Sequence, residues 1–270
     1  MNLFHLLDRI ESLDLTLTNQ VNNRRGAFKN ISKIASGVAM ATIPLLVRPM
    51  KAAAQTPSAA VTDALNLLLV MKYLVLSFYS KGIDSPNLIP ANHLGSIKQV
   101  QTDESHHISF LKGLIGPQAQ TQPTFDFNPG GTQYSPFSRA FVDFVDFVNI
   151  GFTFEDLGNR LLQGVIAELS GETDLQRDLM NMHSVEARHS AHFRYLFTQV
   201  RAGGAESIWV QDPYNSFTNY SFVVPIYVDE ENHIQLGIIQ AGSGAFDEPM
   251  KTVEAKKILN TFIVSPKYVI

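Results

Sequence analysis

Two stretches decide the fold of this chain: Asp103-Glu104-Ser105-His106-His107 and Val185-Glu186-Ala187-Arg188-His189. Each contains a Glu-x-x-His motif, formed by Glu104 with His107 and by Glu186 with His189. Residues three apart lie on the same face of an α-helix, so each carboxylate would project beside its imidazole. Apolar residues recur at steps of three or four on both sides of each motif. This period predicts that each motif lies on the core-facing side of a helix.

The same periodicity continues over most of the chain after residue 60. It predicts four long helices, at about residues 62–81, 96–114, 138–169 and 174–200. The first carries Lys72 within its apolar stripe and the third carries Glu155. A charged side chain is costly to bury unless it pairs with another charge or binds a metal. The sequence therefore predicts an all-α four-helix bundle with a charged cluster inside its core.

The types and spacing of the charged residues indicate a metal centre. A carboxylate-bridged di-metal site takes one Glu from each of two helices and a Glu-x-x-His motif from each of the other two. The candidate ligands in this chain are Glu104, His107, Glu155, Glu186 and His189. The fourth carboxylate of such a site is missing, because the first helix offers Lys72 instead.

The chain resembles the ferritin-like family of exported bacterial proteins related to desiccation-associated proteins. The segments that carry this resemblance are Leu65–Tyr79, Asp103–His107, Phe154–Gly158, Val185–His189 and Ala245–Pro249. The resemblance implies a ferritin-like four-helix bundle with its metal ligands at the five positions given above. The chain departs from the family at Lys72, where a glutamate is usual, and at Val75, which is often acidic.

Charge sets an expectation for the number of ions. Three glutamates and Lys72 sum to −2, which one divalent ion balances. We therefore expect at most one iron or manganese ion, bound on the side away from Lys72. An ammonium also supplies three donors to neighbouring carboxylates, so a metal-free polar network with Lys72 as counter-ion is an equal alternative. If burial left Lys72 neutral, a second metal position would reopen.

One neighbour of the motifs is a candidate supporting residue. Asp103 could accept the second N–H of His189, as carboxylates often do behind a metal-bound histidine. Val185 holds the equivalent place on the fourth helix and cannot do the same for His107.

Residues 1–54 have the order of a twin-arginine-like signal peptide. The pair Arg24-Arg25 precedes an apolar run from Ile34 to Val47, and Ala52–Ala54 offers small residues for cleavage. The run is too short for a permanent membrane span. We expect the twin-arginine export machinery as a partner and a periplasmic or otherwise exported product. The alternative is an N-terminal helix of a cytoplasmic protein with a chance arginine pair.

The remaining boundaries follow from composition. Residues 55–203 would form the bundle, and residues 204–270 a C-terminal extension with a β-hairpin (220–228 and 233–240) and a short helix at about residues 252–262. The net charge of −4, without a basic run after residue 51, excludes nucleic acid as an expected partner. The absence of cysteine excludes disulfides and thiolate metal sites. A homo-oligomer is compatible with these features.

Two functions are compatible with the sequence. The first is metal-dependent redox or iron-handling chemistry in the cell envelope, which the two Glu-x-x-His motifs favour. The second is a metal-free structural or stress-protective role of the desiccation-related kind, which Lys72 favours. The sequence leaves open whether the protein is an enzyme.

Overall fold

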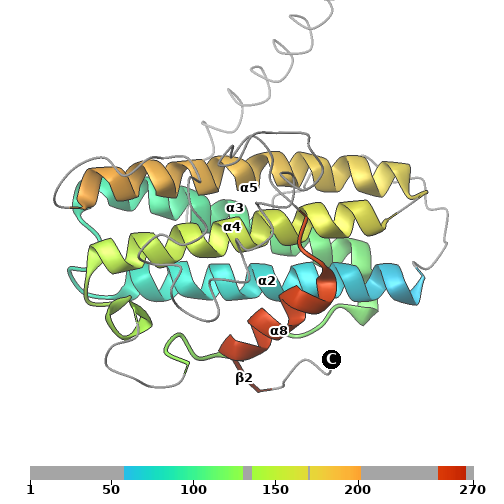
Figure 1. The fold of residues 1–270 in the computed structure, drawn as a ribbon, viewed down its shortest axis with the longest axis horizontal. Coiled ribbons are helices and arrows are strands. Elements are labelled where there is room, and N and C mark those ends of the chain that lie inside the picture. The colour runs from blue at the N-terminus through green and yellow to red at the C-terminus, as the bar shows by residue number, and fades with distance from the viewer. Residues whose placement is uncertain (1–57, 130–135, 170, 202–248, 266–270) are drawn as a thin grey trace, which may run out of the picture. The chain divides into compact units, whose positions relative to one another are not determined.

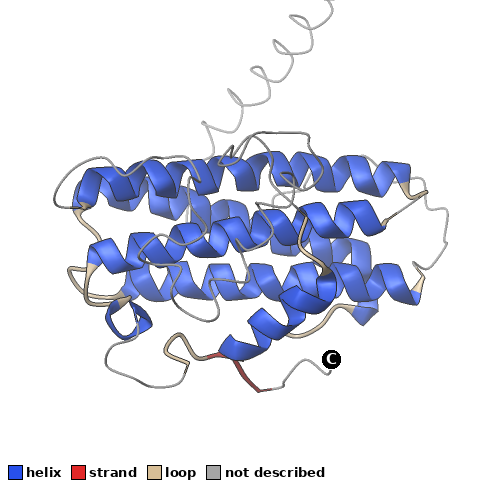
Figure 2. Ribbon diagram, in the orientation of Figure 1, coloured by secondary structure: helices blue, strands red, loops and turns tan. Residues whose placement is uncertain are grey.

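Four long helices form the bundle that the periodicity predicts. The structure is a computed structural model that describes residues 58–129, 136–169, 171–201 and 249–265. The helices are α2 (Ala59–Asp84), α3 (Ala91–Ile115), α4 (Phe144–Glu168) and α5 (Thr173–Val200) (Figures 1 and 2). The predicted all-α architecture is confirmed. The predicted signal peptide and the predicted β-hairpin lie outside the described residues.

The four helices pack as two pairs. α2 packs against α3 and α4 packs against α5, while α2 and α4 join the two pairs. Figure 1 shows α3 and α4 pointing the same way along the bundle, so the connection between them has to return along its length. The short helical turns η1 (Gly116–Gln118) and η2 (Pro136–Arg139) lie in this connection.

A two-stranded sheet joins the connection to the C-terminal region. Strand β1 (Thr124–Phe125) pairs antiparallel with β2 (Ile263–Ser265), and Asp126 N donates to Phe262 O over 2.7 Å. Directly before β2 lies helix α8 (Thr252–Phe262), which confirms the short helix predicted there. Its apolar side is buried against α2 and α4.

Helix α4 begins later than predicted. Its first residue is Phe144, rather than one near Ser138, because Asp143 caps it: the Asp143 carboxylate accepts from the backbone N–H groups of Val145 and Asp146, over 2.9 and 3.2 Å. These bonds satisfy donors that have no partner within the helix, and they favour a start at this residue. Ser58 caps α2 through its side chain, which accepts from Val61 N, so α2 begins at Ala59, earlier than the start predicted near residue 62.

Gly82 lies inside its helix, because α2 continues to Asp84, beyond the end predicted near residue 81. A Cβ atom at residue 82 would lie 2.1 Å from the ring of Phe147, so glycine is needed for close packing against α4. By length and apolar composition α2 could cross a membrane, but most of it is buried within the bundle, as expected for a core helix.

Candidate metal centre

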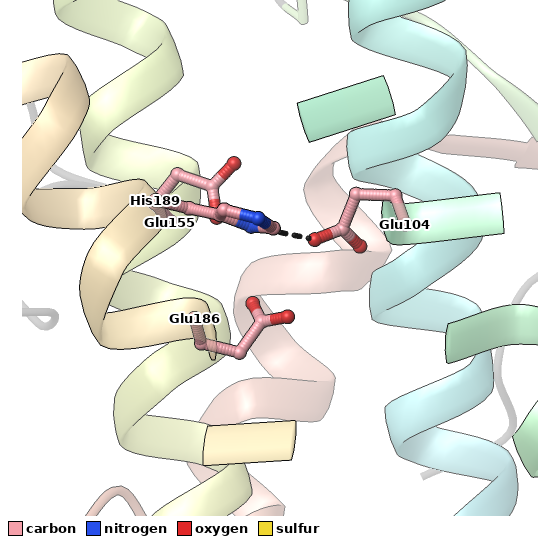
Figure 3. A group of neighbouring side chains, drawn as sticks. All are labelled: Glu104, Glu155, Glu186 and His189. Atoms are coloured by element: carbon pink, nitrogen blue, oxygen red, sulfur yellow. Dashed lines mark ion pairs between the residues drawn. The ribbon is translucent and has the colours of Figure 1, made fainter. Parts of the chain in front are cut away.

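The charged residues that interrupt the apolar stripes meet in the middle of the bundle. Glu104 comes from α3, Glu155 from α4, and Glu186 and His189 from α5. One ligand atom of each lies within 4.8 Å of the other three. The three glutamates are fully buried. Figure 3 shows the Glu104 and Glu186 carboxylates pointing toward the space beside the His189 ring. The helices thus bring together residues that are up to 85 positions apart in the sequence.

Lys72 of α2 enters the same cluster as its internal cation. Its Nζ lies 3.2 Å from Glu104 Oε2 and donates a hydrogen bond to Glu186 Oε2. The Lys72 side chain is fully buried, as are both carboxylates. Lys72 therefore bridges the two Glu-x-x-His motifs from the helix that offers no carboxylate.

Both motif histidines turn Nδ1 toward the carboxylates of the opposite helix. His107 Nδ1 lies 2.9 Å from Glu186 Oε1, and His189 Nδ1 lies 3.3 Å from Glu104 Oε1. His189 Nδ1 is also 3.6 Å from Glu155 Oε2. The two motifs are thus related by an approximate two-fold arrangement, in which each imidazole faces the other motif's glutamate.

Asp103 makes the contact that the sequence suggested. Its Oδ2 lies 3.2 Å from His189 Nε2, and its Oδ1 accepts a hydrogen bond from Gln99 Nε2 over 2.9 Å. A carboxylate at Nε2 favours a proton on that nitrogen, so Nδ1 is the nitrogen that faces the cluster and can bind a metal after losing its own proton. His189 is therefore oriented as a metal ligand needs to be.

Tyr79 is a member of the site that the sequence did not identify. Its fully buried hydroxyl donates a hydrogen bond to Glu155 Oε1. Its ring stacks on Phe193, with centroids 5.1 Å apart. The available signal was its position two turns after Lys72 on the same face of α2.

A second polar group fixes α4 against α5 beside the cluster. Asp156 accepts hydrogen bonds from Ser190 Oγ and Arg194 Nη2, and Ser190 and Asp156 are both buried. Asp156 directly follows Glu155 in the sequence, and Ser190 directly follows His189. The interaction therefore fixes the height at which those two side chains face each other.

The cluster keeps Lys72 charged in the metal-free protein. Burial acts to lower the pKa of the Lys72 ammonium, but the carboxylates, Glu104 first, raise it above its usual value. This balance favours the charged ammonium over the alternative in which burial leaves Lys72 neutral. Burial acts to raise the pKa of Glu104, while Lys72 and the two imidazoles hold that pKa well below its usual range. Lys72 and Glu104 thus form a charged pair.

Protons and metal compete for the other side of the cluster. Burial raises the pKa of Glu155 to about 7, against the opposing effect of His189. Burial also acts to lower the pKa of His189, but the neighbouring carboxylates of Glu104 and Glu155 raise it to about 11. His189 therefore carries a proton in the metal-free protein, and a metal ion would have to displace it.

The donor atoms fit a metal ion. Five buried atoms of the cluster have no hydrogen-bond partner among the described residues: Glu104 Oε2, His107 Nδ1, Glu155 Oε2, Glu186 Oε1 and His189 Nδ1. Buried polar atoms are rarely left unpaired, so such a group calls for an ion or water. Imidazole and carboxylate together suit first-row metals such as iron and manganese. The cluster is therefore compatible with a metal ion.

Comparison with known proteins places this site in a family. Residues 60–199, just over half of the chain, match the model of the ferritin-like domain. The chain belongs to the ferritin-like domain family, and the matched region contains all four bundle helices and every residue of the cluster. Among curated proteins, none matches the chain.

Proposed function

We propose that this ferritin-like protein binds a single divalent ion, iron or manganese, and that Lys72 takes the place of a second ion. The observation that carries the proposal is the bridge from Lys72 to Glu104 and Glu186 in an otherwise intact Glu and His cluster. Glu104, Glu155, Glu186, His107 and His189 would hold the ion. When bound, it would supply redox or iron-handling chemistry.

Charge supports one ion rather than two. Once the ion has displaced the protons of His189 and Glu155, Lys72 and three glutamates sum to −2, so one divalent ion brings the cluster to neutrality. A second dication about 4 Å from the Lys72 ammonium would be repelled by about 8 kcal/mol at an effective dielectric of ~20. Among the described residues of the ligand cluster there are three glutamates and no fourth carboxylate to offset this repulsion.

The other residues of the cluster prepare the site. Asp103 orients His189, and Tyr79 donates to one oxygen of Glu155, which leaves the other oxygen for the ion. The full burial of the three glutamates excludes bulk water. Such a site is preorganised in the sense that its ligands are held by a second layer of hydrogen bonds.

The same bridge favours a second candidate function. Lys72 already pairs with two of the three glutamates, which makes a metal-free bundle with a structural or stress-protective role in the cell envelope an alternative. In that case the cluster serves only to specify the core, as buried ionic groups can do.

Metal analysis separates the two functions. Protein purified from its native host should contain up to one equivalent of iron or manganese. The metal-free protein should take up one equivalent in a titration, and Lys72→Glu should take up two. Lys112→Glu, an exposed position on α3, is the matched control for charge and should take up one. Two equivalents in the natural protein, with a magnetically coupled signal, would refute the single-ion site. If protein from the native host contained no metal and the metal-free natural protein took up none in the titration, the metal-free function would be favoured.

Export of the protein belongs to the same proposal. Arg24-Arg25, the apolar run that follows and Ala52–Ala54 support a twin-arginine signal and a periplasmic location. Replacing both arginines by lysine should retain a tagged protein in the cytoplasm. Normal export of that variant would exclude the twin-arginine route.

A further inference from the structure

The two histidines of the cluster are not held equally. His189 has its outer nitrogen, Nε2, against Asp103, which Gln99 holds in turn. Asp103 directly precedes Glu104, and the corresponding residue before Glu186 is Val185. By the two-fold arrangement of the motifs, Val185 stands toward His107 as Asp103 stands toward His189. A valine accepts no hydrogen bond, so His107 lacks the support that His189 has.

The less supported histidine also lies where the cluster comes closest to solvent. The His107 side chain is 12% exposed and that of Asp103 is 28% exposed, whereas Lys72 and the three glutamates are fully buried. His107 and Asp103, the two partly exposed residues, belong to α3 and contact residues of α5. The close helix contacts are those of α2 with α3, α4 with α5 and α2 with α4, so α3 and α5 approach each other less closely.

The inner contact of His107 adds to this difference. Its Nδ1 lies 2.9 Å from Glu186 Oε1, which is ion-pair distance, but neither atom has a partner in hydrogen-bonding geometry among the described residues. The ion-pair contact with Glu186 therefore holds the His107 ring only on its inner side, and no described residue accepts a hydrogen bond from its outer nitrogen, so this ring rotates more easily than that of His189. His189 is fixed on its outer side and more deeply buried, at 6% exposed.

We propose that divalent metal ions enter and leave the centre between α3 and α5, with His107 as the ligand that swings aside and His189 as the ligand that stays. This inference rests on the metal centre proposed above and names the path by which that centre is loaded. The difference between Asp103 and Val185 sets which histidine moves.

The experiment gives His107 the partner that it lacks. Val185→Asp places a carboxylate beside His107, and Ala187→Asp adds the same charge at an exposed position of α5. Uptake of Mn²⁺ and its removal by a chelator are followed by stopped-flow mixing. We expect Val185→Asp to slow both rates about tenfold without weakening the equilibrium affinity, and Ala187→Asp to leave both unchanged. An added negative charge alone would speed the uptake of a cation, so slowing cannot come from charge.

A second arm needs no added charge. His107→Ala should raise the association rate of Mn²⁺, because the path stands open, whereas His189→Ala should leave it unchanged and raise only the dissociation rate. Wild-type rates in Val185→Asp, or equal association rates in the two alanine variants, would overturn the path through His107 while the metal centre stands. No metal binding by the natural protein would overturn the proposed function, and this path with it.

Discussion

Replacing Lys72 by methionine tests the charge balance of the core directly. Methionine keeps a similar length but removes the ammonium that pairs with Glu104 and Glu186, and all three side chains are fully buried. Removing one partner of a buried pair costs about 3–5 kcal/mol, because the remaining charge is left without compensation. For a unit of roughly 200 residues, each kcal/mol lowers Tm by about 2–4 °C. We therefore expect Lys72→Met to lower the Tm of the metal-free protein by about 10 °C.

The assay is thermal and urea unfolding at pH 7 with a chelator present, with Lys112→Met as control. Lys112 is exposed on α3, so its replacement should change the free energy of unfolding by less than about 0.5 kcal/mol. Adding Mn²⁺ should then raise the Tm of Lys72→Met more than that of the natural protein, since the three glutamates around the bound ion carry −3 without the ammonium once the ion has displaced the protons of the cluster. Ligand binding stabilises by an amount that grows with affinity.

A loss of less than about 1 kcal/mol in Lys72→Met would refute this reasoning. It would mean that the glutamates take up protons when the ammonium is absent, so that Lys72 is not what balances them. An equal Mn²⁺ shift in both proteins would refute the link between Lys72 and the number of ions.

Three further outcomes follow from the structure. Asp103→Asn should weaken metal binding about 10–100-fold in a chelator competition, because the proton on His189 is no longer directed to the outer nitrogen, while a partly exposed side chain contributes little to folding. Glu155 keeps its proton in the folded, metal-free protein up to about pH 7 but loses it near pH 4.5 when unfolded. The free energy of unfolding should therefore fall by roughly 3 kcal/mol as the pH rises from 4.5 to 7, and urea unfolding of Glu155→Gln should lack this fall. Gly82→Ala should cost about 1–3 kcal/mol in the same assay because its Cβ would overlap an aromatic ring, whereas Gly113→Ala, with open space around it, should gain about 0.5–1 kcal/mol.

The helices were predictable because their signal is local. A stripe of apolar residues at steps of three or four needs no knowledge of the partner helix. The prediction fails where a contact with residues far away in the sequence decides where a helix ends or which strands pair. Gly82 has the appearance of a helix stop until the ring of Phe147 is seen against it. The pairing of β1 with β2 joins residues about 140 positions apart, and no local pattern indicates such a pair.

The candidate site divides in the same way. Charged residues in an apolar stripe are conspicuous, so the Glu and His cluster and Lys72 could be located from the sequence alone. Tyr79 was missed because an aromatic residue in such a stripe is ordinary, and only the structure places its hydroxyl against Glu155. The charge on Lys72 also needed the structure, because burial and the surrounding carboxylates oppose each other and their balance depends on distance.

The bridge from Lys72 to Glu104 and Glu186 has a consequence at the level of the gene. Codons for lysine begin with A and those for glutamate begin with G, and their remaining bases are shared. Under the proposed function, one nucleotide substitution in the codon for residue 72 therefore separates a gene for a one-ion protein from a gene for a two-ion protein. Natural sequence variation can cross between the two without passing through an intermediate residue.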